Sequence, residues 1–161
     1  MGTQKDDVRR GRRPAAGSSS VEIRVAQGRD AASVAALLGE LGYPTSAEQA
    51  AERLERIASD PSTWVIVAEV ESDLAGLGAL HVQNLVERDE PGCEVAGLVV
   101  GDAFRRRGIG ELLMEALEAE ARRRGGSAMV LNTAHRRADA HAFYEALGYE
   151  HTGRRYAKDL G

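Results

Sequence analysis

The stretch from Glu94 to Gly125, EVAGLVVGDAFRRRGIGELLMEALEAEARRRG, constrains the fold of this chain more than any other. Its first part is a short, β-branched-rich apolar run that glycines bound on both sides. Because such a run is too short for a helix, it predicts a buried strand. After a basic turn, apolar residues recur at helical spacing, acidic residues come first and three arginines come last. This charge order suits the helix dipole, and it predicts a long amphipathic helix.

The turn between this strand and this helix, Arg105–Gly110 or RRRGIG, has the composition of an anion site. Gly108 and Gly110 let the backbone approach a ligand closely, at a point where the first helical N–H groups have no partner. The guanidinium groups of Arg105, Arg106 and Arg107 add positive charge at the same point, which suits a phosphate or pyrophosphate. Alternatively, the arginines form a solvated basic run and the glycines only shape the turn. The position between strand and helix favours the ligand site.

Two motifs in this chain resemble those of the GNAT superfamily of N-acetyltransferases. Arg105, Gly108 and Gly110 fill the fixed positions of motif A, Arg/Gln-x-x-Gly-x-Gly/Ala after a strand and before a helix. The block Asp139–Tyr149, DAHAFYEALGY, is similar to motif B, Ala-x-x-Phe-Tyr-x-x-x-Gly-Phe/Tyr. The resemblance extends less strongly from Val21 to Leu160. It implies an enzyme that moves an acetyl group from acetyl-CoA to a primary amine by direct transfer in a ternary complex, with no metal.

The remaining elements predict an α/β (α+β) domain with a mixed, mostly antiparallel sheet of about seven strands and about four helices, as the resemblance also implies. Asp30 is expected to cap the first helix, which Gly42 ends, and Thr45 or Ser46 is expected to start the second. The other expected elements are a first strand at 21–25, a hairpin of 64–70 with 74–86, a strand at 128–132, a helix that Gly148 ends, and closing strands at 149–151 and 154–160.

Composition and charge bound the class of protein. The chain has no apolar run of 18 residues and a charged start, which indicates neither a membrane span nor secretion and favours a cytoplasmic protein. Its one cysteine, Cys93, cannot form an internal disulfide. Residues 1–20 hold five basic and two acidic side chains, net +3, so a total of −4 leaves −7 on the rest. We expect a disordered basic leader at 1–20 and one domain at 21–161, with an acidic body that weakly favours a cationic substrate over nucleic acid.

The resemblance implies two catalytic residues. Glu94 stands eleven residues before Arg105, the spacing at which histone acetyltransferases of the superfamily place their general base; the alternative is a solvent-facing residue at the strand start. Tyr144 matches the tyrosine of motif B, which gives a proton to the departing thiolate. Its alternative role is packing, in an aromatic helix face with Phe143 and Tyr149.

The resemblance also implies the contacts with the cofactor. Backbone groups of the motif A strand pair with the pantetheine arm, and one N–H polarises the thioester carbonyl. Arg137 stands where many members have a cofactor-binding asparagine, and Asn132 is an alternative polar contact. The full expected set is Leu98, Val99, Val100, Arg105, Arg106, Arg107, Gly108, Ile109, Gly110, Asn132, Arg137 and Tyr144.

Substrate recognition and assembly are less determined by the sequence. Tyr43 and His81 are possible substrate contacts, although a packing or surface role suits either. The acceptor, a small amine or a peptide, is not fixed by any motif, and the protein is expected to be a monomer or homodimer that binds neither nucleic acid nor membrane. Two other functions are possible, a non-catalytic acyl-CoA-binding or sensing module with the same fold, and a nucleotide binder that uses the basic turn.

Overall fold

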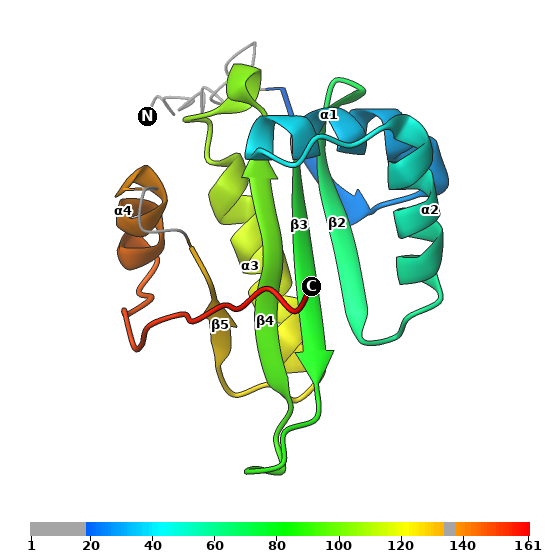
Figure 1. Cartoon of the computed structure of the whole chain (residues 1–161). Helices are drawn as coiled ribbons and strands as arrows, with labels where there is room; N and C mark the ends of the chain where they lie inside the picture. Colours follow the sequence, from blue (N-terminus) through cyan, green and yellow to red (C-terminus); the bar gives the residue numbers. More distant parts are fainter. Residues whose placement is uncertain (1–18, 134–137) are drawn as a thin grey trace, which may run out of the picture.

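The computed structural model describes residues 19–133 and 138–161, which form one mixed sheet with helices on both faces (Figure 1). Five strands lie in the order β1-β2-β3-β4-β5; the first four pair antiparallel, and β5 pairs parallel to β4. The elements are β1 (Val21–Val25), α1 (Ala31–Leu41), α2 (Ala47–Ala58), β2 (Thr63–Val70), β3 (Asp73–Gln83), β4 (Gly92–Val100), α3 (Ile109–Arg123), β5 (Met129–Leu131) and α4 (Ala138–Ala146), with 3-10 turns at Gly28–Asp30 and Asp102–Phe104.

The predicted order of strands and helices and the mixed, mostly antiparallel sheet are confirmed, but the predicted number of seven strands is wrong. The two closing strands expected at 149–151 and 154–160 are absent, and the chain from His151 to Gly161 is irregular and exposed throughout. This segment carries Arg154, Arg155 and Lys158 among few apolar residues, so it has little to bury against a sheet edge. The second strand of the central hairpin also ends earlier than expected, at Gln83 rather than Val86.

The apolar residues of the sheet form two clusters, one on each face. On one face α1 and α2 cover side chains that include Val67, Leu77 and Val99. On the opposite face α3 covers Ile66, Leu80 and Val95, with its own Leu113 and Leu117 fully buried.

Two glycines of β3 let α3 lie close to the sheet. A Cβ added at Gly76 would lie 2.9 Å from the carbonyl oxygen of Val99 and 3.1 Å from Cδ1 of Leu113, and one at Gly78 would lie 3.2 Å from Cδ1 of Leu117. A glycine within a strand is typical of a bulge or of close packing, and the structure shows both at these positions. The register of β2 and β3 shifts at Ala68–Glu69, beside Gly76.

The helix ends follow the sequence signals with one exception. Ser46, one of the two residues expected to start α2, caps this helix in a capping box with Gln49. Gly42 and Gly148 take the left-handed conformation that ends α1 and α4. Asp30, however, does not cap α1 with its side chain, which the sequence predicted it would do. Its carboxylate is instead buried in ion-pair contact with Arg24.

No helix in the described part of the chain combines the length and the apolar composition that a membrane span requires.

Candidate active site

The turn before α3 exposes the start of that helix. Gly108 has φ +75° and precedes the first helical residue, Ile109, which is buried. A Cβ added at Gly108 would meet nothing within 4 Å, whereas one at Gly110 would lie 3.1 Å from Cζ of Phe143 on α4. Gly108 therefore faces open space beside the unpaired N–H groups of α3, and Gly110 makes room for the α4 aromatic ring.

The arginines of this turn are exposed but do not all point freely into solvent. Arg105 forms an ion pair with Asp102 at 2.8 Å, and its Nε lies 3.4 Å from the carbonyl oxygen of Val100. The guanidinium of Arg107 lies over the ring of Phe104, with 5.5 Å to the ring centroid. Arg106 has φ +62°, which is uncommon for a residue with a side chain and gives the turn a tight bend. Local contacts thus fix the positions of two of the three charges.

Strand β4 has an open edge between this turn and its start. Among the residues that the structure describes, β4 pairs on this side only with β5, from Cys93 to Val95. On its other side it pairs with β3 along its whole length, with a register shift at Ala79–Leu80 that leaves Ala96 as a bulge. The N–H of Gly101 points to β3, where it donates to the carbonyl of Ala75. Because directions alternate along a strand, the backbone groups of Leu98 and Val100 point to the open side.

Val99 differs from its two neighbours. Its carbonyl oxygen faces Gly76 of β3, and its side chain is buried under α1 and α2. Of the three residues expected to pair with a cofactor arm through their backbones, Leu98 and Val100 therefore present groups at the open edge and Val99 does not.

Glu94 is the middle one of the three β4 residues that pair with β5, just before the unpaired part of this edge begins. Its neighbours Cys93 and Val95 belong to the α3 face, so its side chain lies on the face of α1 and α2. The side-chain amide of Asn132, one residue beyond β5, donates to Oε1 of Glu94 at 2.9 Å. His81 of β3 is the cross-strand partner of Glu94 and lies on the same face. The structure thus brings together three residues that the sequence indicated separately.

Two further residues extend this row across β2. Oγ1 of Thr63 lies 3.2 Å from Nδ1 of His81 and donates to Oδ2 of Asp60 at 2.9 Å. Asp60 also accepts from the hydroxyl of Ser62 at 2.6 Å and from its N–H at 2.9 Å. These bonds, led by that from the Ser62 hydroxyl, lower the pKa of Asp60. Nothing in the sequence indicated a functional role for Asp60 or Thr63.

Tyr144 lies on α4 at the other side of β5. Its ring makes edge contacts with Phe143, at 5.1 Å between centroids, and with Tyr149, at 6.0 Å. The Tyr149 hydroxyl donates to Glu118 of α3 at 2.9 Å, and burial, with this bond, raises the pKa of Tyr149. Tyr149 is therefore a structural residue, which holds the end of α4 against α3.

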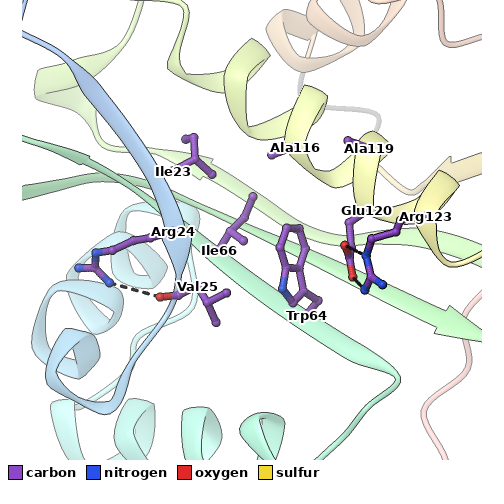
Figure 2. Close-up of a pocket in the computed structure, with 9 residues that line it drawn as sticks. All are labelled: Ile23, Arg24, Val25, Trp64, Ile66, Ala116, Ala119, Glu120 and Arg123. Carbon is purple, nitrogen blue, oxygen red and sulfur yellow. Dashed lines mark hydrogen bonds and ion pairs between the residues drawn. The ribbon is translucent and has the colours of Figure 1, made fainter.

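A cavity of about 1,330 Å³ contains Tyr144 and Asn132 in its wall, together with His141 and residues of the C-terminal segment. A second cavity, of about 450 Å³, lies on the α3 face between β1, β2 and α3 (Figure 2). Trp64 lies at its centre beside the Glu120–Arg123 ion pair, which lowers the pKa of Glu120 to about 2. None of the candidate site residues that the structure describes lines this second cavity.

The structure gives no support for a role of two other expected site residues, Tyr43 and Arg137. Tyr43 follows α1 and is 64% exposed, at the end of the sheet away from Glu94. Arg137 lies outside the described residues.

Comparison with known proteins identifies relatives of the whole domain. The model of the acetyltransferase (GNAT) family matches residues 33–149. The aminoalkylphosphonate N-acetyltransferase of Salmonella typhimurium is 32% identical over 144 residues, which is 86% of this chain and 91% of that protein.

Solved structures of lower identity show the same fold. An aminoglycoside N-acetyltransferase in complex with CoA superposes with a TM-score of 0.80 at 18% identity, over 92% of this chain and all of that one. The glucosamine-6-phosphate N-acetyltransferase of Arabidopsis thaliana gives 0.77 at 21% identity, over 88% and 99%.

Proposed function

Since the chain belongs to the acetyltransferase (GNAT) family and is an acetyl-CoA-dependent N-acetyltransferase, we propose that it transfers the acetyl group directly to a primary amine in a ternary complex. The observation that carries this proposal is the open edge of β4, which leads from the exposed start of α3 down to Glu94. The edge offers backbone donors and acceptors, the helix start offers unpaired N–H groups, and Glu94 offers a carboxylate at the far end.

The residues present fit acetyl-CoA. Gly108 faces open space where a diphosphate can approach the N–H groups of α3, and Arg106 adds charge nearby. The backbone groups of Leu98 and the N–H of Val100 face this edge and can pair with an amide-bearing arm, as a sixth strand would, while the Val100 carbonyl accepts from Arg105. When bound, acetyl-CoA supplies an acetyl group activated as a thioester. We do not assign Val99 to this contact, because its carbonyl faces β3.

Glu94 acts as the general base in this proposal. A primary amine is mostly protonated at neutral pH, so it must lose a proton before it can attack a carbonyl carbon. The amide of Asn132 orients the Glu94 carboxylate from the β5 side through the bond to Oε1. This bond leaves the second carboxylate oxygen of Glu94 available to an amine or to an intervening water.

Tyr144 acts as the general acid. Its phenol is a proton donor at neutral pH, and the edge contacts with Phe143 and Tyr149 fix the orientation of its ring. It shares a cavity wall with Asn132, which links it to the carboxylate of Glu94. The phenol can therefore give its proton to a thiolate that leaves between α4 and β4.

Direct transfer, without an acyl-enzyme, agrees with the position of the one cysteine. Cys93 is 2% exposed on the α3 face, opposite to Glu94, and burial raises the pKa of its thiol. A buried thiol with a raised pKa is a poor nucleophile, so it cannot take the acetyl group from a cofactor at the open edge.

The acceptor class is tested with amines drawn from the relatives. The Salmonella relative is named for aminoalkylphosphonates and a structural neighbour for aminoglycosides, so a panel contains both, with polyamines and peptides. The assay measures free CoA thiol released from acetyl-CoA and the mass of the N-acetylated product. We expect release that depends on at least one primary amine. Acetyl-CoA binding without turnover on the whole panel would support a sensing module instead.

A further inference from the structure

The hydrogen bonds around His81 determine which ring nitrogen carries its proton. Asp60 is ionised at neutral pH and can only accept, so the Thr63 hydroxyl gives its single proton to Oδ2 of Asp60. The oxygen of Thr63 can then only accept from Nδ1 of His81, at 3.2 Å. Nδ1 is therefore the protonated nitrogen, and Nε2 of the neutral ring is a free base.

Two carboxylates belong to the surroundings of His81. Asp60 is connected to the ring by the hydroxyl of Thr63, which contacts both residues, and Glu94 is the cross-strand partner of His81 on β4. Cross-strand partners have Cβ atoms about 5 Å apart, so Glu94 is within electrostatic reach of the ring. A basic group also contacts this loop: Arg124 donates to the carbonyl of Pro61 and is ion-paired with Glu120. An imidazolium at His81 is thus flanked by two carboxylates.

We propose that His81 is the second proton acceptor of the acetyl transfer: Asp60 and Thr63 hold its ring in the Nδ1–H form, and Nε2 takes over the proton that Glu94 removes from the acceptor amine. This inference rests on the proposed function and adds to it two residues that orient His81, Asp60 from the loop after α2 and Thr63 from the start of β2. His81 is a positioning and relay residue, because it acts through Glu94.

The protons balance along this route. One proton of the alkylammonium passes by way of Glu94 to Nε2, and the neutral amine then forms a C–N bond as the C–S bond of the thioester breaks. Tyr144 protonates the leaving thiolate, and the second proton of the attacking nitrogen restores its phenol. The imidazolium of His81 gives its proton to solvent. The relay is useful because an imidazole is ordinarily a stronger base than a carboxylate by about 2 pH units.

The experiment compares kcat and kcat/KM between pH 5 and 9 for wild type and four variants. His81→Gln removes the base, and we expect kcat to fall about 10- to 100-fold. Thr63→Val removes the orienting hydroxyl and should lower kcat about 5-fold with KM unchanged, whereas Thr63→Ser keeps the hydroxyl and should restore most of the rate. Asp60→Asn replaces a carboxylate that can only accept by an amide that can donate to Thr63, so the Nδ1–H form is no longer fixed and kcat should fall about as far as in Thr63→Val.

Two controls separate this inference from the proposed function and from misfolding. Acetyl-CoA affinity by calorimetry should be the same in all variants, which shows that they fold. The ¹³Cδ2 chemical shift of His81 reports the tautomer without any need for activity, and it should indicate Nδ1–H in wild type and a mixture in Thr63→Val. An active wild type with an Nε2–H ring, or a His81→Gln variant with an unchanged rate and acidic limb, would overturn the relay and leave the acetyltransferase intact. An inactive wild type would overturn the proposed function.

Discussion

Replacement of Asp30 by asparagine tests how β1 is joined to α1. Asp30 is 4% exposed and accepts from both Nη atoms of Arg24, at 2.8 and 2.9 Å, and from the N–H of Gln27 at 2.8 Å. Loss of one partner of a buried ion pair costs about 3–5 kcal/mol. Because Arg24 keeps its ion pair with Glu69 at 2.7 Å, we expect Asp30→Asn to cost somewhat less, about 2–3 kcal/mol. The corresponding fall in Tm is roughly 6–9 °C.

The contribution of the Asp30–Arg24 ion pair to stability should depend on pH in a defined direction. Arg24 lowers the pKa of Asp30 below its ordinary value, so the stabilisation is present above the pKa of the unfolded chain and is lost as pH falls through the lower folded value. Urea unfolding of wild type and Asp30→Asn should therefore differ fully at pH 7 and converge below about pH 4. Glu52→Gln, at an exposed position of α2, is the control and should change stability by under about 0.5 kcal/mol. A deficit that is absent at pH 7, or equally large at pH 3, would refute the reasoning.

Three further experiments test the packing and the chemistry. Gly76→Ala should lower the free energy of unfolding, measured with urea, by about 1–3 kcal/mol, because the added Cβ has no room under α3. Gly39→Ala, on the open face of α1, is the control and should raise it by about 0.5–1 kcal/mol. Equal effects of the two substitutions would contradict the packing described. Glu94→Gln and Tyr144→Phe should each lower kcat about 100-fold or more with acetyl-CoA affinity kept within twofold, and unchanged turnover in both would remove their catalytic roles. The Cys93 thiol should react with a thiol reagent at pH 8 only after denaturation, and immediate labelling of the native protein would show that it is accessible.

Local patterns were enough to predict much of the sheet and most helix ends. The strand at Val21–Val25 agrees with the structure residue by residue, and Ser46, one of the two residues expected to start α2, forms a capping box with Gln49. Each of these signals depends on neighbours within a few positions, where propensity and hydrogen bonding decide the outcome. Asp30 shows the limit of such reasoning, since its residue type suits a cap but a more distant partner, Arg24, holds its carboxylate.

The prediction of two closing strands, at 149–151 and 154–160, was wrong for a related reason. Alternation in the segment after Tyr149 is weak, and strand formation there depends on whether an edge is available to pair with it, which sequence alone does not reveal. Three-residue β5 provides little edge, and Val130 at its centre is 57% exposed.

The sequence indicated individual residues of the candidate site, but it could not predict how these residues are arranged in space. Motif spacing indicated Glu94 and the turn at Arg105–Gly110, yet the cross-strand partnership of Glu94 with His81 depends on the bulge at Ala96, which shifts the register of β4 by one residue. The same bulge decides which backbone groups face the open edge. Asn132 was indicated as a cofactor contact, whereas in the structure its amide binds Glu94.

The central claim is that acetyl-CoA binds along the open edge of β4 with its diphosphate at the start of α3. Backbone amide chemical shifts of ¹⁵N-labelled protein, followed during titration with acetyl-CoA, test it most directly. The account predicts saturable shifts at Leu98, Val100, Gly108 and Gly110, with little change at Trp64 in the cavity on the other face. Saturable shifts confined to the surroundings of Trp64, or none at all at millimolar acetyl-CoA, would contradict it.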